Sequence, residues 1–307
     1  MNKVVAKNRK YCAEISLALN EPMPGTAAPT DVWLLLEYNA SWAGKANVAN
    51  TLDRDFLEWW LRVPAMFEEM GLRTRQQFIR QPDVATKGVR FIISMVAPYG
   101  NETFQFQFTD YSEFMQFDWV ALVDAPEKFG EARIFEPNYF VCTNGKRDIC
   151  CARLGLKTYL QLRKFASKRV WQITHLGGHR FAPNVLVLPN PVMYGRVFAD
   201  DVTKFVMHVE SGKLDIDKAR GRPLYEPAAQ AAEVYLLEQG FNGGELVGLR
   251  QNQGDDKDVF ECLFLENEDT ICVKLRRTSS ALEIIASCGS SATKLHYPFE
   301  MLSVERQ

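Results

Sequence analysis

The spacing of apolar residues divides the N-terminal part of the chain into strands and helices. The stretch 52–70 repeats apolar residues about every 3.6 positions, which predicts a helix. Residues 103–108 alternate strictly between apolar and polar, and with 89–96 they predict a hairpin that turns near Tyr99. The expected elements are strand 33–36, helix 52–70, strands 89–96 and 103–108, and helical segment 111–123. Their order is β-α-β-β-α.

A similar order follows in the middle of the chain. Its expected elements are strand 138–141, helix 154–165, strands 170–173, 185–188 and 194–198, and helix 201–211. The order β-α-β-β-β-α resembles that of the first part, although the residues themselves do not repeat clearly. We infer two similar α/β halves.

The C-terminal part changes to strands after an Ala-rich helix at 227–238 and a Gly-rich break at 240–244. Its expected strands are 259–265, 270–275, 282–286 and 295–304, separated by turn-forming residues. They predict a small antiparallel sheet or barrel. The predicted domains are therefore 1–130, 131–240 and 241–307, with a possible first helix at 11–19.

Composition and charge restrict the class of protein. The 307 residues are 47% hydrophobic and 24% charged, which is ordinary for a folded globular chain. A net charge of −2 with scattered basic residues gives no field that favours nucleic acid or an anionic membrane. No apolar run could span a bilayer and no signal peptide is apparent. We expect a cytoplasmic protein that binds neither nucleic acid nor membrane.

The chain has seven cysteines, an odd number that argues against a disulfide framework. Reduced thiols or metal thiolates are expected instead. Four cysteines stand singly among apolar or small residues, where a free thiol usually acts as a small, inert hydrophobic group. These four are Cys12, Cys262, Cys272 and Cys288.

Metal-binding residue types are concentrated between positions 142 and 179. The segment contains Cys142, Cys150, Cys151, His175 and His179. Two thiolates and two imidazoles can hold zinc, and the spacing of the two histidines suits a zinc site, although the two outer cysteines are farther apart than usual. A [2Fe–2S] cluster with two histidine ligands is the other possibility, and spacing alone does not separate it from zinc.

Residues around these ligands add weaker indications. The start of the following helix would stabilise a thiolate at Cys151. A stabilised thiolate favours metal ligation and thiol redox chemistry equally. A thiol oxidoreductase using Cys150 or Cys151 is therefore a third possibility. Arg147 and Asp148 could pair beside the sulfurs or on the surface.

Two glycines fit the candidate metal site, and the two other histidines of the chain lie outside it. Gly177 and Gly178 separate His175 from His179 and allow a tight loop close to a bulky centre. His208 and His296 stand in apolar surroundings typical of structural histidines.

The sequence gives no support for hydrolysis. It has no Gly-x-Ser-x-Gly elbow, no phosphate-binding loop and no dinucleotide fingerprint. Paired carboxylates such as Glu68 and Glu69 are typical of a solvated surface. Glycosidase chemistry therefore has no candidate residues.

Three segments resemble the sucrase/ferredoxin-like family, a branch of the thioredoxin-like [2Fe–2S] ferredoxins. They are Cys-Thr-Asn-Gly-Lys-Arg-Asp-Ile-Cys-Cys at 142–151, the stretch 170–189 with its His-Leu-Gly-Gly-His, and Tyr-Gly-Arg-Val at 194–197. The resemblance implies an α/β fold with a thioredoxin-like ferredoxin domain, preceded by a related α/β half and followed by a small mostly-β domain.

The resemblance also implies a ligand set and a function. The bis-histidinyl members hold the cluster by residues that match Cys142, Cys151, His175 and His179, while Cys150 falls on a non-ligand position. The implied function is electron transfer with a redox partner protein or a small donor or acceptor. Sucrase activity has no support in the residues, and a zinc-stabilised interaction module remains the alternative.

Overall fold

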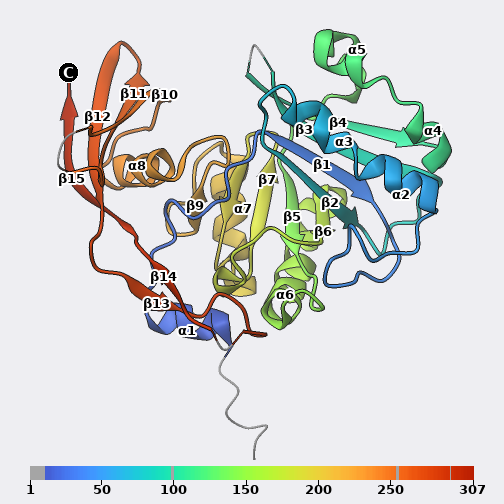
Figure 1. The fold of residues 1–307 in the computed structure, drawn as a ribbon, viewed down its shortest axis with the longest axis horizontal. Coiled ribbons are helices and arrows are strands. Elements are labelled where there is room, and N and C mark those ends of the chain that lie inside the picture. The colour runs from blue at the N-terminus through green and yellow to red at the C-terminus, as the bar shows by residue number, and fades with distance from the viewer. Residues whose placement is uncertain (1–10, 98–99, 254–255, 291) are drawn as a thin grey trace, which may run out of the picture.

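The computed structural model describes residues 11–97, 100–253, 256–290 and 292–307. The predicted turn at Tyr99 and the segment 1–10 lie outside the described residues. Within them the chain forms a mixed α/β protein with a separate β region at its C-terminal end (Figure 1).

Nine strands form the main sheet, in the order β4-β3-β1-β2-β6-β5-β7-β8-β9. Their bounds are β1 Val32–Glu37, β2 Thr74–Arg80, β3 Val89–Ala97, β4 Gly100–Phe108, β5 Asn138–Cys142, β6 Val170–Ile173, β7 Val185–Leu188, β8 Val192–Tyr194 and β9 Ala219–Gly221.

The two halves of this sheet share one pairing scheme. In the first half β1 runs parallel to β2 and antiparallel to β3, which pairs with β4. In the second half β5 runs parallel to β6 and antiparallel to β7, which pairs with β8. The second half is the expected thioredoxin-like unit, and the first half is a related unit. The predicted fold class is confirmed.

The strand β2 was not expected from the sequence, and the predicted β-α-β-β-α order of the first half is therefore wrong. Its residues Thr-Arg-Gln-Gln-Phe-Ile-Arg are mostly polar, yet Phe78 and Ile79 are fully buried and Gln76 almost so. Strands on both sides supply the burial that the sequence pattern does not indicate. With β2 included, both halves have the order β-α-β-β-β-α.

Helices connect and cover the strands. Their bounds are α1 Cys12–Ala18, α2 Arg54–Trp60, α3 Val63–Glu68, α4 Tyr111–Met115, α5 Trp119–Asp124, α6 Ile149–Ala166, α7 Val202–Glu210 and α8 Pro227–Glu238. Short 3-10 turns lie at Pro126–Ala132, Ser167–Arg169, His179–Phe181 and Ala199–Asp201. Within the described part of the chain, no helix combines the length and apolar character needed to cross a membrane.

The expected helix 52–70 is interrupted. It consists of α2 and α3, and Pro64 stands in the first turn of α3. Proline lacks the backbone N–H that would continue the earlier helix and is tolerated at the start of a new one. The expected segment 111–123 is likewise divided into α4 and α5.

The two halves are joined where β2 pairs with β6. The pairing is antiparallel and short, with Ile79 opposite Ile173 and Arg80 opposite Gln172. A common core lies on one face of both halves and contains Trp33 and Leu35 of the first with Phe140 and Trp171 of the second. The helices of each half cover separate cores. The site described below lies against the common core.

The sheet is strongly curled. The guanidinium of Arg90 in β3 lies 4.2 Å from the ring centroid of Trp171 in β6, three strands away in the sheet order. Asn101 of β4 donates a hydrogen bond to the carbonyl of Pro189, just beyond β7. These contacts bring distant strands together on the concave face.

The C-terminal region forms its own sheet, in the order β10-β11-β12-β15, which lies at one end of the molecule (Figure 1). The strands are β10 Glu245–Gln251, β11 Val259–Glu266, β12 Asp269–Arg277, β13 Leu282–Ile284, β14 Lys294–His296 and β15 Phe299–Arg306. Helix α8 packs on this sheet through an apolar cluster. The hairpin of β13 and β14 lies beside α1, so the N-terminal arm and a hairpin of the C-terminal region meet near α6.

The buried ion pair between Glu37 of β1 and Arg90 of β3 provides a test of the packing within the first half, from which Arg90 also contacts Trp171 of the second. Arg90 Nη2 lies 2.6 Å from Glu37 Oε1, and both side chains are more than nine-tenths buried. Arg90→Met should lower the free energy of unfolding by about 3–5 kcal/mol, because it leaves the Glu37 carboxylate buried without a cation. Urea unfolding followed by circular dichroism measures this.

The control is the exposed pair of Arg54 with Glu58, for which Arg54→Met should cost less than about 1 kcal/mol. The double variant Glu37→Leu/Arg90→Met should regain most of the stability. If it is as unstable as Arg90→Met alone, Arg90 acts through packing on Trp171 and the ion-pair explanation is wrong.

Candidate metal centre

Two parallel neighbouring strands bring Cys142 and the two histidines together. Cys142 is the last residue of β5 and lies opposite Ile173, the last residue of β6. The carboxyl ends of parallel strands meet at one edge of a sheet, where the following loops form a site. His175 and His179 stand in the loop that follows β6, and His179 begins its 3-10 turn.

Cys151 reaches the same place from α6. The Asp148 side chain caps this helix by accepting a hydrogen bond from the backbone N–H of Cys150 at 2.9 Å. Neighbouring residues of an α-helix point about 100° apart, so Cys150 and Cys151 face different surroundings. Cys151 lies in the core that contains Cys142, whereas Cys150 lies in a cluster with Cys12.

The four predicted ligand residues contact one another. Cys151 Sγ lies 3.3 Å from His179 Nδ1. The rings of His175 and His179 stack with centroids 4.6 Å apart. Cys142 lies close enough to Cys151 and His175 for both to lower the pKa of its thiol. Two sulfurs and two imidazoles thus form one compact group.

Burial differs within this group. Cys142, Cys151 and His179 are buried, while His175 is partly exposed. His175 lines a surface cavity of about 280 Å³, whose opposite wall is the loop 44–48 of the first half. Asn144 fixes this wall by donating a hydrogen bond to the carbonyl of Ala43 at 2.8 Å. His175 is therefore the side of the group that faces solvent.

The surroundings favour the protonation states that metal ligation needs at Cys142 and His179, but not at Cys151. The hydrogen bond from Cys151 lowers the pKa of the Cys142 thiol, burial opposes this, and His175 and the backbone N–H of Leu176 lower it further. The hydrogen bond with Cys142 and burial raise the pKa of Cys151. Burial, followed by the nearby His175, lowers the pKa of His179 to about 4. At neutral pH His179 is an uncharged imidazole, as a metal ligand must be.

One imidazole nitrogen of the four-residue group makes no hydrogen bond to the described residues. Within the described residues, Nδ1 of His175 is buried and has no hydrogen-bond partner. A buried polar atom without a partner is costly and calls for an explanation such as an ion or a cofactor. The donor set of two sulfurs and two imidazoles fits a zinc ion and equally fits a [2Fe–2S] cluster with two histidine ligands.

The loop between the histidines has the tight geometry that its glycines predict. Gly177 and Gly178 have φ values of +83° and +69°, in the left-handed region that favours glycine. A Cβ atom on Gly178 would lie 2.7 Å from Nη2 of Arg220, whereas one on Gly177 would meet nothing within 4 Å. Gly178 is thus required both for its backbone conformation and for the close approach of Arg220.

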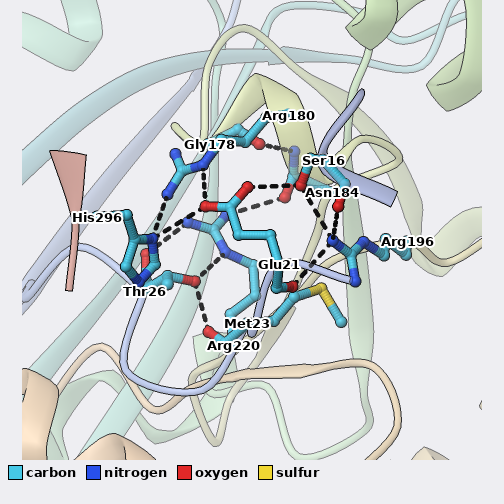
Figure 2. A network of polar contacts seen from close by, with 10 residues as sticks. All are labelled: Ser16, Glu21, Met23, Thr26, Gly178, Arg180, Asn184, Arg196, Arg220 and His296. Atoms are coloured by element: carbon cyan, nitrogen blue, oxygen red, sulfur yellow. Dashed lines mark hydrogen bonds and ion pairs between the residues drawn. The ribbon is translucent and has the colours of Figure 1, made fainter. Parts of the chain in front are cut away.

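Arg220 and Asn184 hold this loop from below (Figure 2). Arg220 Nη1 donates to the carbonyl of Gly177 at 3.0 Å and to Asn184 Oδ1 at 2.9 Å. Asn184 donates in turn to the carbonyl of Gly178 at 2.9 Å. The network continues outward through Thr26, which accepts hydrogen bonds from Arg220.

Arg75 holds the other end of the same loop. Its guanidinium donates to the carbonyl of Leu176 at 3.1 Å and to that of His175 at 3.3 Å. Burial lowers the pKa of Arg75 to about 10 and that of Arg220 to about 9. Both therefore remain cationic at neutral pH, and two positive charges, on the buried Arg220 and the partly exposed Arg75, flank the four-residue group.

A second part of the network ties the N-terminal arm to this loop. The fully buried Glu21 lies 2.6 Å from Arg180 Nε, accepts a hydrogen bond from Ser16 at 2.6 Å, and lies 2.9 Å from Nδ1 of His296 (Figure 2). His296 thus has the structural role that the sequence predicts. His208 lies away from the centre, 3.5 Å from Asp215.

The two charged residues expected beside the sulfurs lie apart from each other. Arg147 lines the cavity next to His175. Asp148 turns toward the other thiols, where it accepts hydrogen bonds from the backbone N–H groups of Cys150 and Cys288.

With this geometry established, comparison with known proteins places the chain. The sucrase/ferredoxin-like family model matches residues 23–221, more than half of the 307 residues. The chain belongs to the sucrase/ferredoxin-like family. The matched range includes both halves of the main sheet and all four residues of the candidate centre.

Similar curated proteins carry the name "Altered inheritance of mitochondria protein 32". The one from Meyerozyma guilliermondii is 33% identical over 105 residues, which are 31% of this chain and 37% of that protein. Those from Clavispora lusitaniae and Debaryomyces hansenii are 28% and 27% identical, over 33% and 38% of this chain and 41% and 46% of theirs. The chain thus spans less than half of the length of these relatives.

A search of solved structures gives a thioredoxin-like [2Fe–2S] ferredoxin from Aquifex aeolicus. It is 18% identical, with a TM-score of 0.25, over 28% of this chain and 91% of that one.

Sequence reasoning missed three residues of the centre and misjudged two thiols. Asn184 belongs to a segment of the family resemblance but had no predicted role, Arg220 lies in the short strand β9, and Arg75 lies in the unexpected strand β2. Cys12 and Cys288 are not isolated inert thiols as expected, because both lie against Cys150. Their positions are 276 residues apart, so no local pattern could indicate the contact. Cys262 is buried in the C-terminal sheet, and Cys272 is partly exposed there.

Adjacent glycines give a matched test of the loop geometry. Gly177→Ala should lower the free energy of unfolding by about 1–2 kcal/mol, because an alanine must adopt a left-handed conformation. Gly178→Ala should lose about 1–3 kcal/mol more, because its methyl group also displaces Arg220. Urea unfolding measures both. Equal losses would mean that Arg220 moves aside freely and does not fix the loop.

Proposed function

We propose that the chain binds one [2Fe–2S] cluster through Cys142, Cys151, His175 and His179 and acts as an electron carrier. The observation that carries this is the mutual contact of the four side chains in a buried pocket, with an imidazole nitrogen that has no partner in the described structure. Replacement of two cysteine ligands by two histidines on one iron is established cluster chemistry.

The chain's own residues prepare this site for ligation. The lowered pKa of Cys142 favours its thiolate and the lowered pKa of His179 keeps its imidazole neutral, whereas Cys151, whose pKa is raised, must release its proton on binding. The N–H of Leu176, which donates to the Cys142 sulfur, stabilises negative charge on that ligand.

Two cations beside the histidine loop set the electrostatics of the site. Arg75 and Arg220 hold the carbonyls of the histidine loop and remain charged at neutral pH. A bound cluster supplies one-electron redox chemistry, and its reduced form carries one more negative charge. Fixed positive charge nearby favours that form and raises the reduction potential, as do histidine ligands.

The surface at His175 is the proposed place of electron exchange. His175 alone among the four is partly exposed, and its cavity is bordered by Lys45 and Arg147. A redox partner protein, or a small donor or acceptor, would approach the cluster most closely there. No residues arranged for hydrolysis accompany the site, so we propose a carrier and not a sucrase.

Cellular location is a separate expectation. The sequence favours a cytoplasmic protein, while the curated relatives are named for the inheritance of mitochondria. We retain the cytoplasm as the proposed location, together with the expected lack of nucleic-acid and membrane binding.

Metal and sulfide analysis of anaerobically purified chain tests the proposal. We expect two irons and two acid-labile sulfides per chain. Cys142→Ser and Cys151→Ser should abolish both, because each removes a thiolate that serine replaces poorly. Cys150→Ser is the matched control on the same helical turn and should retain the cluster, because Cys150 faces away from Cys142.

Other outcomes identify the alternatives. Zinc without sulfide that disappears in Cys142→Ser or Cys151→Ser would contradict the cluster and support a zinc-stabilised module. Neither iron nor zinc at these residues, with thiols that oxidise reversibly, would support a thiol oxidoreductase instead.

Histidine ligation is tested separately by substitution and redox titration. His175→Cys and His179→Cys should each keep a cluster whose reduction potential is lower by roughly 100 mV or more, because thiolate donates more negative charge than imidazole. His208→Cys is the control and should leave the potential unchanged, since His208 lies away from the centre. An unchanged potential in both ligand variants would exclude histidine ligation.

A further inference from the structure

Three cysteines that the [2Fe–2S] proposal leaves unused meet on the far side of α6. Cys12 begins α1, Cys150 lies in the first turn of α6, and Cys288 lies between β13 and β14. They come from three parts of the chain, with Cys12 and Cys288 each 138 residues from Cys150. Because these thiols come from distant segments, the tertiary fold brings them together, and their contact does not follow from proximity in the sequence.

The three sulfurs form a nearly regular triangle. The Sγ atoms of Cys12 and Cys150 are 3.7 Å apart, those of Cys150 and Cys288 are 3.2 Å apart, and those of Cys288 and Cys12 are 3.4 Å apart. Around a tetrahedral zinc ion with Zn–S bonds of about 2.3 Å, neighbouring sulfurs are about 3.8 Å apart. The distances between the sulfurs therefore need to increase by at most about 0.6 Å to hold the ion.

A disulfide accounts for this arrangement less well. Its S–S bond is about 2.05 Å, so any two of these sulfurs would have to approach by more than about 1 Å. The third thiol would then remain beside the bond without a partner. Three sulfurs at similar separations suit a shared ion.

Asp148 provides a fourth donor. Its carboxylate accepts from the N–H of Cys150 at 2.9 Å, from Ser287 Oγ at 2.9 Å and from the N–H of Cys288 at 2.8 Å. Both of its oxygens lie 3.9 Å from the sulfur of Cys12. A carboxylate offers about four acceptor positions, so one remains after these three bonds. All four donor atoms lie within 4.8 Å of one another.

Backbone N–H groups also point at the sulfurs. The N–H of Cys12 donates to Cys288 Sγ at 3.3 Å, and the N–H of Ala13 lies close enough to lower the pKa of the Cys150 thiol. Such hydrogen bonds stabilise thiolates bound to a metal. Cys12, Cys150 and Asp148 are buried, while Cys288 is partly exposed and leaves a path for an ion to enter.

We propose that Cys12, Cys150 and Cys288, with Asp148 as the fourth ligand, form a zinc site distinct from the Cys142–His179 centre. The metal would join α1, the start of α6 and the loop before β14, and so fix the N-terminal arm and the C-terminal hairpin to the thioredoxin-like unit. Its role is structural, because all four coordination positions are filled by the protein.

Metal titration in a background without the other centre tests this proposal. The full chain carrying Cys142→Ser and His175→Ala is purified under reducing, anaerobic conditions and titrated with Co²⁺ and then Zn²⁺. One equivalent of Co²⁺ should bind with thiolate-to-metal charge-transfer absorption and be displaced by one equivalent of Zn²⁺. Adding Cys12→Ser or Cys150→Ser should abolish this equivalent, while Cys272→Ser, in the C-terminal sheet, should retain it.

A second variant distinguishes loss of a metal ligand from loss of folding. Cys288 is the partly exposed member, and Cys288→His replaces it by another zinc ligand. It should keep one equivalent of Co²⁺ with weaker charge-transfer absorption. Three results would each overturn the proposal. The background chain binds neither ion, or Cys12→Ser and Cys150→Ser leave the binding unchanged. The third is the loss of two free thiols without bound metal.

The two proposals can fail independently. In the otherwise native chain, Cys151→Ser should lose iron and sulfide but keep zinc, and Cys150→Ser should lose zinc but keep iron and sulfide. Absence of iron with zinc retained contradicts only the cluster, and absence of zinc with iron retained contradicts only the second site.

Discussion

The parallel pairing of β5 with β6 is the constraint on which the candidate centre depends. Parallel strands cannot be joined by a tight turn, so the chain must cross over between them, and here it does so through α6. The crossover starts beside the end of β5 and returns the chain so that β6 ends there too. Cys142, Cys151 and the histidine loop therefore meet at one edge of the sheet as a consequence of topology. The conformation of that loop is then fixed by side chains, and these come from both halves of the molecule.

The first half is therefore part of the site and not merely an appended domain. Its strand β2 pairs with β6, and it places Arg75 against the carbonyls of His175 and Leu176. Thr174, the residue before His175, donates to Gln77 of the same strand at 2.6 Å. A thioredoxin-like unit alone would lack these contacts, and one of the two cations beside the histidine loop would be missing. The related half can thus lack metal ligands of its own and still influence the charge around the centre.

Sequence reasoning succeeded where contacts are local or where periodicity is strong. The bounds of β6, β7 and α8 agree with the predicted segments, and Cys142, Cys151, His175 and His179 lie together as their spacing and the family resemblance suggested. It failed where burial is imposed from outside the segment. The polar strand β2 is buried by its neighbours, and Arg220 reaches the histidine loop from a strand at the far edge of the sheet. Contacts such as that of Cys12 with Cys288 leave no trace in any local pattern.

The adjacent residues Cys150 and Cys151 belong to two different groups of candidate metal ligands, and the two groups assemble differently. The group around Cys151 draws all its members from β5, α6 and the loop after β6, so folding of one unit suffices to bring them together. The group around Cys150 also needs α1 and the loop before β14, so it forms only once the N-terminal arm and the C-terminal hairpin have reached α6. Asp148 contributes to both, because it caps the helix that presents the two cysteines and holds Cys288 by its backbone N–H. One helix start therefore connects the candidate centre of the middle unit to the contact between the N-terminal arm and the C-terminal hairpin.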